Sequence, residues 1–183
     1  MKFKETNLLG SFLIDLDKFE DERGFFGRLF CEKEFLANGL NYKWTQINNS
    51  FSKTTATLRG LHFQLQPHSE VKLVRCLHGA IWDVIVDLRL GSSTFGKWFG
   101  IYLSASNRTM IYIPKGFAHG FITLQPNSEI LYLVSNFYEP KSEQVLLWSD
   151  PDISINWPSS PVVISEKDKL GHTLKNIHTK LSP

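Results

Sequence analysis

Two histidines occupy the segments of this 183-residue sequence whose residue types are best suited to chemistry. The first, His62, lies in "TLRGLHFQLQP", which reads as a strand because polar and apolar residues alternate. A regular strand would turn one set of side chains to one face: Leu58, Gly60, His62 and Gln64. It would turn the other set to the opposite face: Arg59, Leu61, Phe63 and Leu65. His62 is therefore either a structural core histidine or a group that lines a cavity.

The second histidine, His119, lies in "IPKGFAHGF", where Pro and Gly form a turn before a strand. This spacing resembles the second sequence motif of cupins, small jelly-roll barrels in which that histidine points inward. The metal-binding form of the first cupin motif carries two histidines separated by one residue, followed by a glutamate. Here Gln64 replaces the second histidine and Glu70 lies further on. A transition metal needs about three or four converging ligands, so we expect no metal site.

Other residues in the sequence have both a functional and a structural interpretation. Arg59 and Lys72 suit an anionic substrate such as a phosphate ester, or are solvated surface cations. Tyr132 lies in an apolar strand, where a core aromatic is the simpler interpretation. "SEKD", Ser165 to Asp168, resembles a helix-capping box. "DERGFF", Asp21 to Phe26, could bind a base and its phosphates, or form a turn with Phe25 in the core.

The elements that must position these residues are mostly strands. Short apolar runs separated by Gly and Pro predict one all-β domain, a sandwich or barrel, over residues 1–170. "CEKEFLANGL" predicts one helix near the N-terminus, with Gly39 just after its end. "KLVRCLHGAIWDVIVDLR" predicts two strands joined by a compact hairpin turn at His78 and Gly79. The polar segment 171–183 is expected to be a loosely ordered tail.

Composition excludes several classes of protein. The net charge is +2 and no basic stripe stands out, so we expect no nucleic-acid partner. No apolar run is long enough for a signal peptide or a membrane span. Cys31 and Cys76 are far apart, which favours free thiols and a cytoplasmic protein over a disulfide framework.

Seven segments taken together resemble the dTDP-4-dehydrorhamnose 3,5-epimerase family of cupin-fold enzymes. They lie in the same order over about Phe12 to Asp168: "DERGFF", "LRGLHFQ", "KLVRCLHGAIWDVIVDLR", "IPKGFAHGF", "ILYLVSNFYEP", "DPDISINWP" and "ISEKD". The resemblance implies a cupin-type jelly roll with a short N-terminal helix and an extended arm. It also implies a nucleotide-sugar substrate, no cofactor and a homodimer.

The resemblance assigns roles to individual residues. It implies that His62 is the general base, that Asp168 pairs with it, that Tyr132 is the acid on the opposite face and that Lys72 lies near the sugar keto oxygen. The positions that match substrate contacts are Arg23, Phe26, Gln46, Asn48, Arg59, His119, Tyr138, Glu143 and Lys167. The segment around Arg23 and Phe26 is expected to reach the site of the partner subunit. Arg28 stands where these enzymes usually carry a glutamate that contacts the base, so it too is a candidate substrate contact.

These residue types suit one reaction. A ketone at C4 of a sugar acidifies the protons on C3 and C5, so a base can remove one while a cation stabilises the negative charge on O4. Inversion then needs a proton from the other face, and no metal or redox cofactor takes part. Together with the resemblance, these residue types predict epimerisation of a nucleotide-linked 4-dehydro-6-deoxyhexose at C3, C5 or both, with dTDP as the expected nucleotide. The alternatives are a related cupin that acts as a 3,4-ketoisomerase or as a 3-epimerase only, and a non-catalytic cupin that binds a nucleotide sugar.

Overall fold

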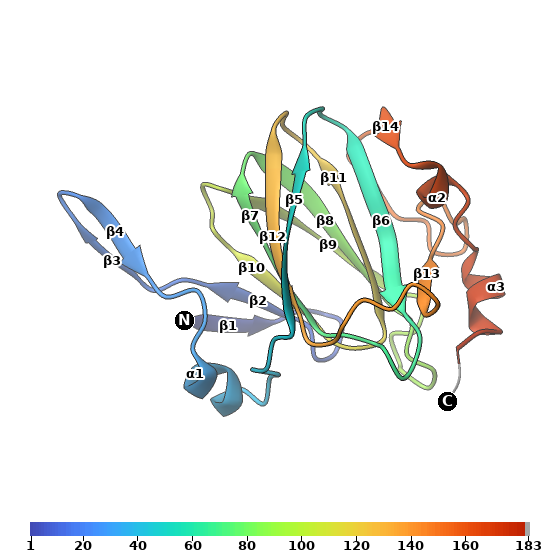
Figure 1. The fold of residues 1–183 in the computed structure, drawn as a ribbon, viewed down its shortest axis with the longest axis horizontal. Helices are drawn as coiled ribbons and strands as arrows, with labels where there is room; N and C mark the ends of the chain where they lie inside the picture. The colour runs from blue at the N-terminus through green and yellow to red at the C-terminus, as the bar shows by residue number, and fades with distance from the viewer. Residues whose placement is uncertain (182–183) are drawn as a thin grey trace.

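Strands dominate the computed structural model, which describes residues 1–181 (Figure 1). They are β1 (Lys2–Glu5), β2 (Phe12–Asp15), β3 (Lys18–Asp21), β4 (Gly24–Gly27), β5 (Gln46–Ser52), β6 (Thr57–Gln64), β7 (Lys72–His78), β8 (Ala80–Asp87), β9 (Trp98–Ser104), β10 (Met110–Ile113), β11 (Phe117–Thr123), β12 (Ser128–Val134), β13 (Glu143–Val145) and β14 (Val163–Ile164). The helices are α1 (Glu32–Ala37), α2 (Glu166–Lys169) and α3 (Leu174–His178). The longest of these helices has six residues, and none is long and apolar enough to cross a membrane. The all-β prediction is confirmed.

Two sheets face each other and enclose the interior. The first has the order β1-β2-β10-β7-β12-β5 and the second β13-β6-β11-β8-β9, with β14 added beside β6. Neighbouring strands are antiparallel, except that β14 runs parallel to β6. Apolar side chains from both sheets, among them Val74, Ile85 and Ile111, pack into one buried cluster between the sheets. This packing fixes the distance between the two sheets, and hence between the polar side chains they share.

The predicted hairpin at His78 and Gly79 is wrong. β7 pairs with β10 and β12 in the first sheet, whereas β8 pairs with β9 and β11 in the second. The chain therefore crosses between sheets at Gly79, whose φ is +71°. A Cβ at Gly79 would lie 3.1 Å from Cα of Ser128, so the corner requires glycine. Hairpins and inter-sheet corners use the same turn residues, and only the packing of the sheets distinguishes them.

The predicted N-terminal helix is present as α1. Phe35 is fully buried, and Gly39 follows the helix with φ +68°, as expected for a residue just past a helix end. Leu36, the next residue of the helix, is exposed. A helix of six residues presents only a narrow face to the core, and Phe35 occupies it.

The expectation of a loosely ordered tail is wrong for residues 171–181, while residues 182–183 lie outside the described part. The tail forms α3, and Ile177 is fully buried in an apolar cluster with Leu61 and Phe63 of β6. The backbone of Leu147 donates a hydrogen bond to His172 over 2.8 Å. One buried isoleucine in a polar segment was too weak a signal to predict this docking.

An extended arm leaves the body of the molecule. β3 and β4 form a two-stranded hairpin that projects away from both sheets (Figure 1). Phe25 on this hairpin is partly exposed and lies under the guanidinium of Arg108, 4.5 Å from the ring centroid. The turn expected in "DERGFF" is present between β3 and β4, but Phe25 is not a core residue.

Candidate active site

An irregularity in β6 places Arg59 and His62 on the same face. His62 pairs with His119 and Arg59 pairs with Phe121. These two pairs are three positions apart along β6 but only two apart along β11, so β6 carries one extra residue between them. The extra residue reverses the alternation of side chains beyond it. Arg59 and His62 therefore both line one cavity, which corrects the regular alternation expected from the sequence.

Gly60 makes this irregularity possible. Its φ is +120°, and a Cβ there would lie 2.6 Å from Cα of Gly120 on the neighbouring strand. No other residue type fits such a close approach of two backbones. The glycine of "LRGLH" therefore serves the site by positioning the residues on either side of it.

The His62 imidazole is held by a buried carboxylate. Nε2 of His62 lies 2.7 Å from Oδ1 of Asp168, whose other oxygen accepts a hydrogen bond from the backbone N–H of Gly60 over 3.2 Å. Asp168 lies in α2, where Ser165 caps the helix by accepting from the Asp168 backbone N–H. The capping interpretation of "SEKD" is thus confirmed, and the same short helix aims its aspartate at His62.

Electrostatics keep the Asp168 carboxylate charged. Burial by itself would raise the pKa of Asp168, but the hydrogen bond and charge of His62 and the N–H of Gly60 hold that pKa below its usual value. A carboxylate that accepts from Nε2 requires the proton on that nitrogen. Nδ1 of His62, which takes part in no hydrogen bond within residues 1–181, then carries the free lone pair.

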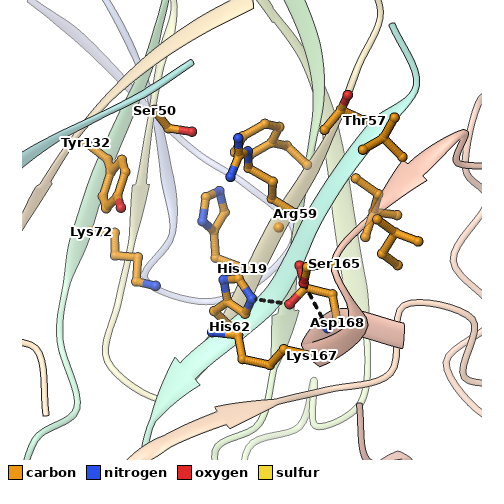
Figure 2. Close-up of a pocket in the computed structure, with 15 residues that line it drawn as sticks. Ser50, Thr57, Arg59, His62, Lys72, His119, Tyr132, Ser165, Lys167 and Asp168 are labelled. Carbon is orange, nitrogen blue, oxygen red and sulfur yellow. Dashed lines mark hydrogen bonds and ion pairs between the residues drawn. The ribbon is translucent and has the colours of Figure 1, made fainter. Parts of the chain in front are cut away.

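The other wall of the cavity carries Tyr132 and Lys72. Figure 2 shows Tyr132 of β12 and Lys72 of β7 across the cavity from His62. The cavity has a volume of about 530 Å³, enough for a bound sugar. No hydrogen bond within residues 1–181 uses the Tyr132 hydroxyl, and burial raises the pKa of this phenol. The His62 imidazole thus faces the Tyr132 phenol and the Lys72 ammonium across the cavity.

Asp83 is a polar residue of the site that we did not predict. It is fully buried, and its Oδ2 lies 2.8 Å from Nε2 of His119. Burial raises the pKa of Asp83, although His119 and Lys72 act in the opposite direction. A signal was present in the sequence, because the alternation of β8 places this aspartate inward between Ile81 and Ile85.

A second cavity of about 400 Å³ shares His62, Lys72 and Tyr132 with the first. Four of the predicted substrate contacts line it: Gln46, Asn48, Tyr138 and Glu143. Lys167, which lines the first cavity, joins the two by an ion pair of 2.9 Å with Glu143. Burial alone would raise the pKa of Glu143, but hydrogen bonds from Lys167 and Tyr138 lower it. The two cavities therefore form one continuous site with several charged groups.

Arg59 is also positioned by its neighbours. Its Nε donates to Oγ of Ser52 over 3.1 Å, and its Nη2 donates to the backbone carbonyl of Phe51 over 3.0 Å. The guanidinium has no carboxylate partner within residues 1–181. Such a cation can bind an anionic group of a ligand.

Three of the predicted substrate contacts lie away from both cavities. The side chain of Arg23 is 89% exposed and pairs with Asp21 of its own hairpin. Phe26 is 65% exposed on the same arm, and Arg28 lies 4.0 Å from Glu34 of α1. Within one chain, therefore, the arm does not contribute to the site.

Within residues 1–181, no group of three or more His, Cys, Asp or Glu side chains is arranged to hold a metal ion. His62 and His119 are each bound to an aspartate. Glu70, the remaining candidate ligand, contacts Gln64 and Lys72. These side chains already satisfy one another, which does not fit a metal-ligand set.

Comparison with known proteins identifies the family. The family model described as dTDP-4-dehydrorhamnose 3,5-epimerase matches residues 5–176. The chain belongs to this family. It is 44% identical over 169 residues to the dTDP-4-dehydrorhamnose 3,5-epimerase of Shigella flexneri, covering 92% of this chain and 93% of that one. Membership makes the chain an epimerase, and hence an isomerase.

Solved structures of the family confirm the cupin-type jelly roll. The epimerase from Legionella pneumophila in complex with dTDP-4-keto-L-rhamnose superimposes with a TM-score of 0.93 at 38% identity, covering 100% of this chain and 97% of that one. A 3'-monoepimerase from Streptomyces bikiniensis in complex with dTDP-quinovose gives 0.87 at 30% identity, covering 96% and 89%. The fold is therefore shared by epimerases that differ in the number of centres they invert.

Proposed function

We propose that this chain inverts C3 and C5 of a dTDP-linked 4-dehydro-6-deoxyhexose, a step of dTDP-rhamnose biosynthesis. The observation that carries the proposal is the pair of His62 and Asp168 on one wall of the cavity, opposite Tyr132 and Lys72 on the other. A base and an acid on opposite sides of a bound ring are what inversion at carbon requires.

The reaction proceeds by proton transfer alone. The lone pair on Nδ1 of His62 takes a proton from the carbon next to the C4 ketone. The C–H electrons form a double bond between that carbon and C4, and the C4=O electrons move to O4, which gives an enolate. The Lys72 ammonium stabilises the negative charge on O4, and Asp168 stabilises the imidazolium. Tyr132 then breaks its O–H bond and gives that proton to the other face of the carbon, which inverts the centre. His62 and Tyr132 return to their starting states by exchange with solvent.

The remaining polar groups bind the nucleotide. Arg59 and Lys167 are the cations available for the diphosphate, and Gln46, Asn48, Tyr138 and Glu143 surround the adjoining cavity. His119, backed by Asp83, contributes a hydrogen bond to the sugar from the wall that also carries His62. No cofactor takes part in this scheme.

We propose further that the working enzyme is a cytoplasmic homodimer. The outer face of the first sheet exposes Ile47 and Phe51 of the edge strand β5, and Arg75 on this face has a buried Nε without a partner within residues 1–181. A second copy covering this sheet would bury these groups, and its arm would bring Arg23 and Phe26 to the neighbouring cavity. The free thiols of Cys31 and Cys76 fit a reducing compartment.

The test of the reaction is deuterium exchange. We expect incubation of the protein with dTDP-4-dehydro-6-deoxyglucose in deuterated water to label both C3 and C5, as read by NMR. The His62→Ala variant should label neither, and normal exchange by that variant would refute the assignment of the base. Labelling and inversion at C3 alone would favour the 3-monoepimerase alternative, which the structural match to such an enzyme makes the second candidate. Binding without any exchange would favour the non-catalytic alternative.

The test of the dimer combines two inactive variants. His62→Ala lacks the base, whereas Arg23→Ala lacks the residue that the arm supplies to the partner. If the arm crosses between subunits, a refolded equal mixture contains mixed dimers in which one of the two sites is complete, giving about one quarter of the wild-type sites. No recovery of activity, or a monomer by analytical ultracentrifugation, would contradict the shared site.

A further inference from the structure

Glu70 is a buried carboxylate in the catalytic cavity to which the scheme above gives no role. It lies between β6 and β7, and its side chain is only 10% exposed. Oε1 of Glu70 lies 3.2 Å from Nζ of Lys72, and Oε2 accepts a hydrogen bond from the amide of Gln64. Within residues 1–181 Lys72 has no other ion-pair partner. Glu70 is therefore the group that fixes where the Lys72 ammonium lies.

Gln64 holds Glu70 rigidly in turn. Gln64 is itself buried, and its Oε1 accepts from the backbone N–H of Glu139 over 2.6 Å. Its Nε2 also lies within 2.9 Å of the His68 carbonyl and 3.1 Å of the Phe137 carbonyl. Because three backbone groups fix the amide of Gln64, the carboxylate of Glu70 can take only a narrow range of positions.

Glu70 also acts on Tyr132 through its charge. Burial raises the pKa of Tyr132 most, the guanidinium of Arg59 lowers it, and the carboxylates of Glu70 and Glu143 raise it further. The other strands and helices around the cavity bring further titratable groups to it: Lys72 from β7, His62 from β6, His119 from β11, and Lys167 and Asp168 from α2. Asp83 of β8 lies behind His119 and is fully buried. Among the carboxylates around the cavity, Glu70 and Glu143 are the two whose charges raise the pKa of Tyr132.

We propose that Glu70 is a positioning residue of the epimerase: held by the Gln64 amide, it keeps the Lys72 ammonium beside the substrate ketone. This inference rests on the proposed function. The same carboxylate has a second, electrostatic effect: it raises the pKa of Tyr132, which favours the protonated phenol, and so opposes the Arg59 guanidinium, which lowers that pKa. The ion pair leaves Lys72 able to donate hydrogen bonds to O4.

The test is the pH dependence of inversion in Glu70→Gln, which keeps the shape of the side chain and removes its charge. We expect the alkaline limb of kcat/KM to move to lower pH, because Tyr132 then loses its proton more easily. Glu70→Ser removes the same charge, should the glutamine variant not fold, and is expected to shift the limb in the same direction. Glu70→Asp keeps the charge but withdraws it from Lys72, so its limb should stay in place while kcat falls.

A matched control removes a carboxylate outside the site. Glu32→Gln does so on the exposed surface of α1, and its pH profile should equal that of the wild type. A purely structural role for Glu70 would lower the rate of the glutamine, serine and aspartate variants equally at every pH without moving the limb. That result would overturn the proposal.

A second readout separates this inference from the reaction itself. Titration of Tyr132 can be followed by NMR of ring-labelled tyrosine without substrate, with Tyr132→Phe identifying the resonance. The resonance should titrate at lower pH in Glu70→Gln than in the wild type, and an unchanged titration would overturn the role of Glu70. Absence of deuterium exchange by the wild type would refute the proposed function instead.

Discussion

Replacing Asp168 by asparagine tests the proposed base more sharply than removing the histidine. The two oxygens of Asp168 accept from two donors, Nε2 of His62 and the backbone N–H of Gly60. Asparagine offers one oxygen and one NH2 group, so one of these donors would face another donor. The backbone N–H cannot change, whereas an imidazole can move its proton to the other nitrogen. The amide oxygen should therefore face Gly60, and its NH2 group should face Nε2.

The consequence is the wrong tautomer of the base. With Nε2 accepting, the proton of His62 lies on Nδ1, and the lone pair that must attack the C–H bond is lost. Loss of a charge-assisted hydrogen bond alone, about 1.5–3 kcal/mol, would slow the reaction roughly 10- to 150-fold. The tautomer change should add to this, for a total of about 10³- to 10⁴-fold, the size of effect known for such a change in a serine protease triad.

The assay compares Asp168→Asn with Asp168→Ala. Alanine removes the carboxylate but leaves room for water and does not dictate the tautomer of His62. The reaction rate of Asp168→Ala should therefore fall only by roughly the 10- to 150-fold expected from loss of the hydrogen bond. Exchange of the C3 and C5 protons in deuterated water, followed by NMR, measures both variants, and thermal melting checks that each is folded. If the alanine and asparagine variants lose the same factor, the tautomer is not the cause and the reasoning is refuted.

Three further outcomes follow from particular contacts. Tyr132→Phe should retain exchange at the carbon that His62 deprotonates but lose inversion at C5, measured from product stereochemistry; unchanged product and rate would count against an acid role. Gly60 and Gly24 share a φ of +120°, but of these two only Gly60 would place a new Cβ against backbone. We therefore expect Gly60→Ala to lower the unfolding free energy by more than about 4 kcal/mol and Gly24→Ala to lower it by about 1–3 kcal/mol. Equal losses would exclude the close approach as the cause. Burial alone would raise the pKa of Asp87, but hydrogen bonds from Arg89, Ser92 and Thr94 lower it below its unfolded value of about 4. The ionised carboxylate therefore stabilises the fold above about pH 4, and this stabilisation is lost as the pH falls through the folded pKa. Asp87→Asn should therefore lower Tm at neutral pH and converge with the wild type in acid; a constant difference would refute this.

Much of the fold was predictable because its signals are local. The strand β8 was predictable because its side chains alternate: Ile81 and Ile85 lie in the cluster between the sheets, whereas Val84 and Val86 lie in a cluster on the opposite face. The helix end at Gly39 was predictable because the positive φ needed there is a property of one residue. The corner at Gly79 and the docking of α3 were not, because each depends on which distant strand or apolar cluster lies opposite.

The candidate site divides in the same way. The seven segments and their order along the chain were enough to predict the family, and the resemblance then assigned acid–base roles to His62, Tyr132 and Lys72. Whether Arg59 faces the same cavity as His62 could not be predicted from alternation, since the extra residue in β6 appears only when the strand is paired with β11. The partnership of Asp83 with His119 likewise depends on the register of β8 against β11.

The sequence by itself determined the chemistry available to this protein, because side-chain types and turn residues act over a few positions. The tertiary structure decided which of those groups meet: Asp168 reaches His62 across 106 positions of sequence, and Glu70 reaches both Gln64 and Lys72. Those contacts depend on the distance between two packed sheets and on one bulge at Gly60. Neither is encoded in any single segment, because both arise only when segments far apart in the chain are buried against one another.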